Sequence, residues 1–257
     1  METVGGLLRR WRNGRRLSQL DLALAAGVSQ RYVSLVETGR SRPSAEMVLR
    51  LAVQLDVPLR DRNRLLVAAG FAPRYRERPL DGADMSAVRD AVTRVLRAHE
   101  PYPALVVDRR WNVVMTNRPI ERFLADVDPA LLREPVNMIR LGLDPRGLAG
   151  RIVNLAEVRE LFRARLARQV ARTGDPVVGA LYDEFFGGPR ESGFEPPPPQ
   201  VATPMVFDFE GRELRLFSTI TTFGTAQDIT VEEISIESYY PSDEESAAVL
   251  RGLAEGD

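Results

Sequence analysis

Residues 29–44 have the sequence SQRYVSLVETGRSRPS, and this stretch decides the fold of the first part of the chain. A serine precedes a run whose apolar residues, Val33 and Val36, recur at the spacing of an amphipathic helix. The run breaks at a glycine and passes into an Arg-x-Arg-Pro tail. Ser29 can cap the helix, because its side-chain oxygen can accept from a backbone N–H that lacks a helical partner. We therefore predict a short helix from Ser29 to about Thr38, followed by a basic loop.

A second short helix is expected immediately before it, from a cap at Ser18 to Ala26. The connection contains LALAAGVS, in which Ala23 is small enough for two helices to meet at close range. Gly27 supplies a left-handed conformation for a sharp turn, and Val28 fills the apolar angle. Two helices joined in this way cross steeply, so that the second can enter a major groove. The sequence predicts a helix-turn-helix.

The second helix of the pair leaves Gln30, Arg31 and Ser34 at its exposed N-terminal end. Gln pairs bidentately with adenine and Arg with guanine, so these side chains suit the edges of bases. The alternative, a helical bundle that binds only protein partners, uses the same apolar pattern.

Helical segments separated by Gly, Pro and Ser extend from Gly5 to about Phe71, which predicts a five-helix domain over residues 1–71. Residues 72–84, APRYRERPLDGAD, are rich in proline and charge and are expected to be a linker. Charge divides at the same place: residues 1–80 hold 15 Arg and 7 acidic residues, whereas the remainder holds 20 Arg and 29 acidic residues. A basic segment joined to an acidic one is typical of a polyanion-binding module attached to another domain.

Composition excludes several classes of site. The chain has 257 residues and no Cys, which excludes disulfides, thiolate metal sites and Cys nucleophiles. Its start, METVGGLLRRWRNGRR, has no apolar signal core, and no apolar run reaches membrane-spanning length. We expect a soluble cytoplasmic protein.

Residues 5–70 resemble the helix-turn-helix domain of the phage-repressor (Xre) class, through LRRWRNGRRLSQ, LALAAGVS and VSLVETGRSRPS. The resemblance implies a DNA phosphate contact from Gln19. It implies base contacts from the start of the third helix, and backbone contacts from the loop that follows: Ser29, Gln30, Arg31 and Ser34, then Thr38, Gly39, Arg40 and Arg42. It also implies an Arg12–Glu37 pair that ties the first helix to the third. Asp21 departs from the Glu that many members carry.

After residue 84 the pattern changes to a mixture of helices and strands. An amphipathic helix is expected over 85–99, with Val88, Val92, Val95 and Leu96 on one side, followed by strands at 104–108 and 111–116 and a helix capped by Asn117. A helix-rich middle at 129–186 and a long loop at 187–204 precede three strands with the sequences TPMVFDFE, ELRLFSTITTF and EEISIESYY. This order predicts an α+β domain with an antiparallel sheet over 85–257.

Nothing in this second domain indicates a reaction. The chain has one histidine, His99, at a helix end, where capping or packing is its ordinary role. We find no phosphate-binding glycine loop, no metal-ligand spacing and no cofactor motif. The acids of DITVEE (228–233) and DEESAAV (243–249) are interpreted as loop acids and solvated helix-end acids. No catalytic residue, metal or cofactor is therefore expected.

The stretch PYPALVVDRRWNVVMTNRPIERFL (101–124), then NMIRLGLDP and the closing strands, resembles the PAS-like C-terminal domain of the MmyB-like regulators. The resemblance implies an apolar cavity between sheet and helices that takes a lipid-like or other hydrophobic effector. Alternation along strand 212–223 places Phe217 and Thr219 on one face and Leu214 and Leu216 on the other. The candidate lining residues are Trp111, Met115, Phe123, Met138, Phe162, Phe217 and Thr219.

The sequence thus predicts a homodimeric transcriptional regulator that binds operator DNA through its first domain and a small hydrophobic effector through its second. The alternative is a constitutive dimeric regulator whose C-terminal domain only oligomerises or binds a protein partner. The operator, the effector and the sign of regulation stay open.

Overall fold

The computed structural model describes residues 2–187 and 204–255. The chain forms two compact units, residues 1–82 with 224–232, and residues 83–223 with 233–257. The expected boundaries differ in two respects. Residues 72–82, predicted as a linker, belong to the first unit, and so does a segment from late in the chain. Most of the loop predicted at 187–204 lies outside the described residues.

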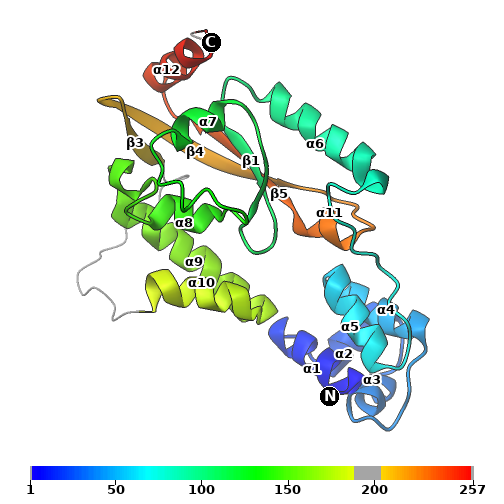
Figure 1. The fold of residues 1–257 in the computed structure, drawn as a ribbon. Helices are drawn as coiled ribbons and strands as arrows, with labels where there is room; N and C mark the ends of the chain where they lie inside the picture. Colours follow the sequence, from blue (N-terminus) through cyan, green and yellow to red (C-terminus); the bar gives the residue numbers. More distant parts are fainter. Residues whose placement is uncertain (1, 188–203, 256–257) are drawn as a thin grey trace. The chain divides into compact units, whose positions relative to one another are not determined.

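The first unit contains the five predicted helices (Figure 1). They are α1 (Val4–Gly14), α2 (Gln19–Ala26), α3 (Gln30–Glu37), α4 (Ala45–Gln54) and α5 (Leu59–Ala68). The predicted caps are confirmed, since Ser18 Oγ accepts from the Asp21 amide and Ser29 Oγ from the Tyr32 amide, each at 3.1 Å. Asp21 also closes a capping box, because its Oδ2 accepts from the Ser18 amide at 2.8 Å.

The core of the first unit includes Val33 and Val36, the two apolar positions predicted for α3, together with Leu8, Leu22, Leu51 and Leu65. Segment 72–82 has no helix but is docked on α5. The Asn63 side chain accepts from the amides of Arg74 and Tyr75 and donates to the carbonyl of Tyr75. These bonds give the segment a fixed course, which its composition did not predict.

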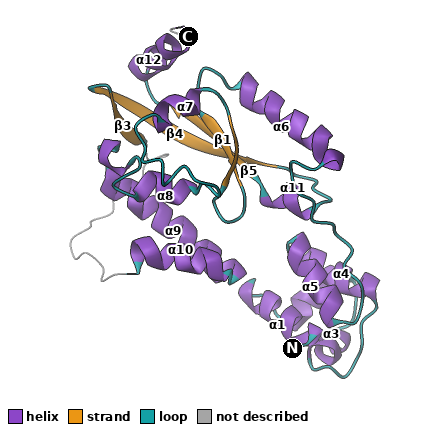
Figure 2. Ribbon diagram, in the orientation of Figure 1, coloured by secondary structure: helices purple, strands orange, loops and turns teal. Residues whose placement is uncertain are grey.

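The second unit is built on a five-stranded antiparallel sheet in the order β2-β1-β5-β4-β3 (Figures 1 and 2). The strands are β1 (Ala104–Val107), β2 (Val113–Thr116), β3 (Met205–Phe209), β4 (Arg212–Thr222) and β5 (Ser235–Pro241). The prediction of an α+β domain with an antiparallel sheet is confirmed.

Helices cover both faces of this sheet (Figure 1). One short 3₁₀ turn (Ala83–Met85) leads into α6 (Ser86–Ala98), and another (Ala149–Arg151) precedes α9. The remaining helices are α7 (Pro119–Leu124), α8 (Met138–Leu143), α9 (Leu155–Thr173), α10 (Pro176–Phe186) and α12 (Glu244–Glu255). Figure 1 shows α6 on one side of the sheet and α8, α9 and α10 on the other. In the described part of the chain, no helix combines the length and apolar character that crossing a bilayer requires.

Three details of the later part of the chain differ from the sequence prediction. Asn117 is not a helix cap: its buried side chain accepts from the Ala104 amide at 2.9 Å and donates to the Tyr102 carbonyl at 2.8 Å. Val95 is 47% exposed, so the buried stripe of α6 is narrower than predicted. The acidic stretch 228–233, interpreted as loop acids, forms the helix α11 (Ile229–Glu233), most of which belongs to the first unit. The acids near 245 lie in the first turn of α12, as expected of helix-end acids.

Candidate nucleic-acid interface and effector cavity

The turn between α2 and α3 has the geometry that its sequence predicts. Gly27 has φ +61°, and a Cβ there would lie 2.6 Å from Arg50 Nη2. The amide of Val28 donates to the Ala23 carbonyl at 2.9 Å, which closes the end of α2. A side chain at Gly27 would therefore meet backbone strain, whereas the end of the exposed Arg50 side chain could move aside.

α3 divides into a buried and an exposed side. Val33 and Val36 are each 1% exposed, and they hold the helix against the core. Ser29, Gln30 and Arg31 are exposed at its amino end, and Ser34 is half-buried one turn further. Gln30 and Arg31 are exposed, so they can approach a surface placed against this end of the helix.

Glu37 at the end of α3 is the centre of a buried polar group. Its carboxylate accepts from Arg12 Nε at 2.7 Å and from Arg12 Nη2 at 3.0 Å, which confirms the predicted pair. Gln19 Nε2 donates to the same carboxylate at 2.8 Å, so Glu37 also orients the side chain that the resemblance assigns to phosphate. Burial opposes ionisation of Glu37, but the hydrogen bonds from Arg12 and Gln19 outweigh it and lower its pKa.

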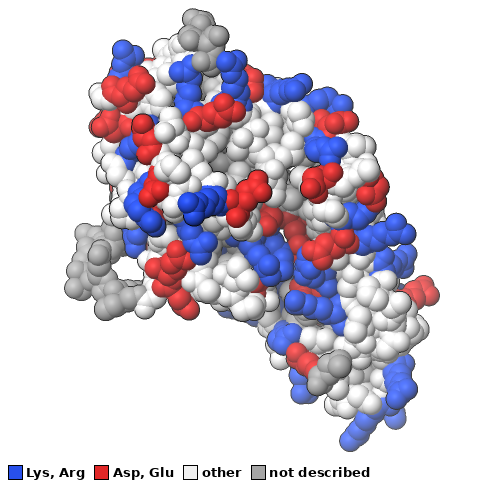
Figure 3. Space-filling view, in the orientation of Figure 1, with Lys and Arg blue, Asp and Glu red and all other residues white. Residues whose placement is uncertain are grey.

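The loop after α3 presents the expected basic residues. Thr38 Oγ1 donates to the Ser34 carbonyl at 2.8 Å, and Gly39 turns the chain with φ +74°. Arg40 and Arg42 follow and are exposed. Figure 3 shows Arg side chains projecting at the edge of this helical unit. Guanidinium groups in such a loop can bind phosphate oxygens beside a groove.

A cavity of about 80 Å³ lies inside the second unit, between the sheet and α7, α8 and α9. Its wall is almost wholly apolar and includes Leu105, Val113, Ile120, Phe123, Met138, Leu141, Phe162, Phe207, Leu216 and Tyr239. Three residues predicted to line a cavity, Phe123, Met138 and Phe162, therefore do so. An apolar pocket of this kind is the usual form of a small-molecule site.

The other four predicted lining residues lie outside the cavity wall. Trp111 packs behind it, edge-on to Phe162 with ring centroids 6.1 Å apart. Met115 pairs with Val106 on the opposite face of the sheet from Leu105.

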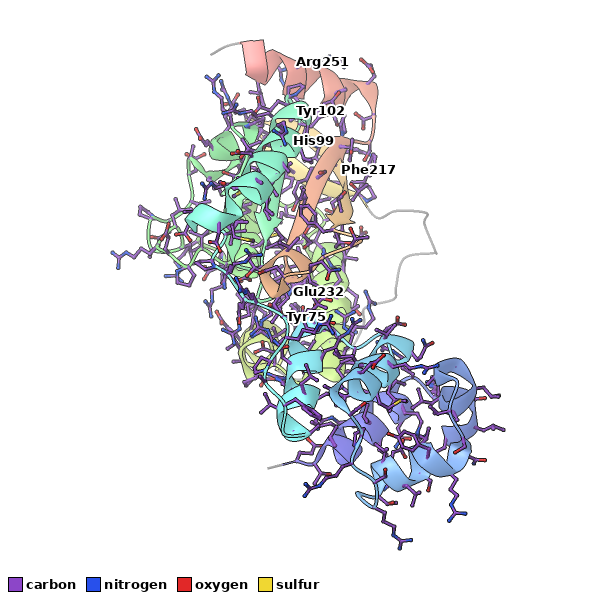
Figure 4. The ribbon with its side chains drawn as sticks, turned by 90° about the vertical axis from the view of Figure 1, so that its right-hand side faces the viewer. Tyr75, His99, Tyr102, Phe217, Glu232 and Arg251 are labelled. Carbon is purple, nitrogen blue, oxygen red and sulfur yellow. The ribbon has the colours of Figure 1, made fainter. Side chains whose placement is uncertain are left out.

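Phe217 also lies on that opposite face, stacked on Tyr240 at 5.3 Å and near His99 and Tyr102 (Figure 4). Thr219, two residues along the same strand, is exposed. The prediction placed residues of both faces of β4 and β2 in one pocket, although a pleated strand can direct only alternate side chains into it.

Most of the lining residues were missed by the sequence prediction, and among them the strand residues Leu105, Leu216 and Tyr239 lie on the sheet face that points into the cavity. The alternation of side chains along each strand could have identified them. Leu216 lies on the same face of β4 as the buried Leu214, and the strand register places Leu105 and Tyr239 on that face as well. Burial, with a smaller contribution from Glu237, raises the pKa of the Tyr239 phenol, so this side chain is a neutral hydroxyl beside the apolar wall.

Two side-chain roles are relevant to chemistry in the described residues, a metal cluster and a reactive histidine. Among them, no three His, Cys, Asp or Glu side chains are grouped so that they could hold a metal ion. His99 Nε2 lies 2.8 Å from the Tyr239 carbonyl, and its ring packs edge-on to Tyr240, so this histidine has a structural role.

Comparison with known proteins gives two family matches. The model of the MmyB-like transcription regulator ligand binding domain matches residues 88–253, and a Helix-turn-helix model matches residues 8–61. The ImmF control region 10 kDa protein of Bacillus phage phi105 is 34% identical over 56 residues, which are 22% of this chain. The match spans 62% of that relative, less than two thirds of its length.

Two solved structures are similar to parts of the chain. The restriction-modification controller protein C.AhdI from Aeromonas hydrophila is 38% identical, with 23% of this chain and 88% of that chain covered and a TM-score of 0.22. The clp gene regulator ClgR from Corynebacterium glutamicum is 26% identical, with 39% and 93% covered and a TM-score of 0.24.

The family matches agree with the two parts of the molecule described above. They confirm the expectation of a regulator rather than an enzyme, with a helix-turn-helix region ahead of a ligand-binding domain. Since the first of them extends over more than half of the chain, this protein belongs to the MmyB-like transcription regulators.

Proposed function

We propose that the first unit binds operator DNA in a sequence-specific manner and that the second unit binds a small hydrophobic effector that controls this binding. The DNA-binding role belongs to residues 1–71, with base contacts from Gln30 and Arg31 and phosphate contacts from Gln19, Arg40 and Arg42. Ser29, Ser34 and Thr38 complete the proposed interface. The effector domain corresponds to residues 85–257. The protein acts as a cytoplasmic homodimer.

The apolar cavity is the observation that carries the effector proposal. A buried space with an almost wholly apolar wall holds water poorly, and filling it with an apolar group is favourable. An apolar cavity of roughly 150 Å³ holds a benzene molecule. The space of about 80 Å³ therefore fits a short apolar group, and a longer chain requires the wall to expand.

Thermal unfolding in the presence of n-alkanols of increasing length tests this proposal. We expect n-hexanol to raise the unfolding temperature of the second unit, because a ligand that binds only the folded state stabilises it. No shift with any alkanol, at concentrations that leave the first unit unaffected, would contradict an apolar effector site. It would favour the alternative in which this domain only oligomerises or binds a protein partner.

Glycine substitutions provide a matched pair for locating the site. A Cβ at Gly142 in α8 would lie 3.8 Å from the Phe162 ring, at the cavity wall, whereas a Cβ at Gly179 in α10 would meet nothing within 4 Å. Gly142→Leu should fill the cavity and weaken n-hexanol binding about tenfold or more. Gly179→Leu should leave binding unchanged. Equal effects of the two substitutions would place the alkanol elsewhere.

A further inference from the structure

α11 carries two consecutive glutamates whose contacts belong to different compact units. Glu232 Oε2 accepts from the Leu59 amide at 2.7 Å, and both residues are in the first unit. Glu233 Oε2 lies 3.4 Å from Nε of Arg109, and both residues are in the second unit. The two glutamates of one short helix thus contact residues of different units.

The amino end of α5 depends on this distant glutamate. Pro58 precedes α5 and supplies no side-chain cap. The first amides of a helix have no partner within the helix, so an acceptor must come from elsewhere. Glu232, which Figure 4 labels, provides it across 173 positions of sequence. Its negative charge suits the positive end of the helix dipole.

Further bonds hold α11 to the first unit. The buried Asp228 accepts from the Thr230 amide through Oδ1 at 2.9 Å and from Arg78 Nε through Oδ2 at 2.8 Å. Thr230 Oγ1 donates to the Arg78 carbonyl at 2.6 Å, and the amide of Ile229 donates to the Arg76 carbonyl at 2.8 Å. α11 is therefore a structural part of the DNA-binding unit, although the chain reaches it from the sheet of the other unit.

The cavity wall lies on the strands that flank α11. Leu216 on β4 and Tyr239 on β5 both line the cavity, and the connection between these two strands contains α11. If Leu216 or Tyr239 is displaced, the strand that carries it moves, and both strands continue directly into the connection that contains α11.

A set of packed side chains leads from the cavity to Glu233. Phe162 of the wall packs edge-on against Trp111, whose Nε1 donates to Gln169 Oε1 at 2.8 Å. Gln169 Nε2 in turn donates to the Arg109 carbonyl. The Arg109 guanidinium pairs with Asp175 at 2.8 Å as well as with Glu233.

We infer that α11 transmits occupancy of the cavity to the DNA-binding unit by loosening the Glu232 cap on α5. The inference rests on the proposed effector function of the cavity. A ligand larger than the existing space must displace its wall, and close-packed interiors pass such displacement on rather than absorb it. The hydrogen bond from the Leu59 amide to Glu232 is then weaker when the cavity is occupied than when it is empty. Regulation requires such a difference in contacts between the two states.

Hydrogen exchange of the Leu59 amide in the full chain tests the inference without any ligand. Arg109→Met removes a partner of Glu233 and should accelerate exchange at Leu59 roughly fivefold, an effect of the size of a weakened helix cap. The control Arg140→Met breaks the exposed ion pair with Glu184 in the same unit and should leave this exchange unchanged. Glu233→Gln is the milder second variant if Arg109→Met unfolds.

A Glu232→Ala background shows whether the effect passes through the cap. In that background the Leu59 amide already exchanges fast, and Arg109→Met should add nothing. Unchanged exchange at Leu59 in both Arg109→Met and Glu233→Gln overturns the inference. So does an Arg109→Met acceleration that persists undiminished after Glu232→Ala, because the effect then bypasses the carboxylate.

Saturation with n-hexanol distinguishes this inference from the proposed function. We expect the alkanol to bind and to accelerate exchange at Leu59, and to lose both effects in Gly142→Leu. If n-hexanol raises the unfolding temperature but leaves Leu59 exchange unchanged, the effector site stands and the role of α11 is wrong. If n-hexanol does not bind, the proposed function and the inference fail together.

Discussion

Glu37 shows how one buried charge can organise a DNA-binding surface. Its side chain is 1% exposed, and a carboxylate placed there without partners would be costly to bury. Arg12 compensates the charge from α1, and Gln19 donates from the start of α2. The same group therefore joins three helices and positions one of the proposed phosphate contacts.

Glu37→Gln should destabilise the first unit by about 3 kcal/mol at neutral pH, because it leaves the Arg12 charge without a counterion. The pKa of Glu37 is lower in the folded state, so its contribution is present above the ordinary carboxyl range and is lost as pH falls through the folded pKa. Hydrogen exchange of α3 amides from pH 7 down to pH 3 measures both effects. A wild-type acid dependence that survives unchanged in the Gln variant would contradict this role.

Arg31 and Arg40 should differ in how they affect binding to DNA. Arg31→Ala is expected to cost about 1–3 kcal/mol on the preferred site and to relax preference at one base position. Arg40→Ala should weaken binding to all duplexes similarly and lower the salt slope by about 0.9. Binding to a selected and a scrambled duplex at several salt concentrations separates these outcomes, and an interchange of the two patterns would reverse the assignments.

At the scale of elements, the packing of α1 against α3 depends on the first of two adjacent glycines. A Cβ at Gly5 would lie 2.3 Å from the Val36 carbonyl oxygen and 2.7 Å from that of Glu37. A Cβ at Gly6 would meet only the Thr3 side chain, at 3.4 Å, and the Glu2 side chain beyond it. The first glycine permits close approach of two helices, whereas the second is a replaceable helical residue.

Gly5→Ala should therefore destabilise the first unit by about 1–3 kcal/mol, since backbone atoms of α3 cannot move aside cheaply. Gly6→Ala should be neutral or stabilising by about 0.5–1 kcal/mol, because alanine restricts the unfolded chain more than glycine does. Hydrogen exchange of the slowest amides of α3 compares the two. Similar destabilisation by both substitutions would show that helix propensity, not contact with α3, sets the effect.

Local signals in the sequence predicted the helices and strands well where caps and periodicity were strong, as at Ser18, Ser29 and Val33. They failed where contacts with residues distant in sequence determine the position of a side chain. Asn117 has a side chain suited to capping a helix, but its side-chain oxygen instead accepts a hydrogen bond from the Ala104 amide at the start of β1. Phe217 alternates correctly along β4, yet only the register with β5 shows which face meets the cavity.

For the whole molecule, the division of charge predicted two parts with different tasks. It did not predict that residues 224–232 belong to the first unit together with residues 1–82. Glu232 and Leu59 are 173 positions apart, and no periodicity or composition links a helix cap to a residue at that distance. The acids of residues 228–233 consequently resembled solvated loop acids, although Asp228 is 3% exposed.

The proposed homodimer leads to a prediction for the intact protein. Two helix-turn-helix units related by twofold symmetry should occupy half-sites whose centres are about one helical turn of DNA apart. Sedimentation of the free protein should give a dimer mass, and hydroxyl-radical footprints on a selected site should show two protected patches with that spacing. A monomer that protects a single patch would contradict the proposed assembly.

The late segment in the first unit also bears on how regulators of this kind can be recombined. Exchange of residues 1–82 alone between two members would join α5 of one protein to the α11 of another. The foreign segment would then have to match Leu59, Arg76 and Arg78. A chimera in which residues 224–232 are exchanged together with residues 1–82 preserves those bonds, and its DNA binding should still respond to effector. A chimera in which only residues 1–82 are exchanged should bind DNA without that response.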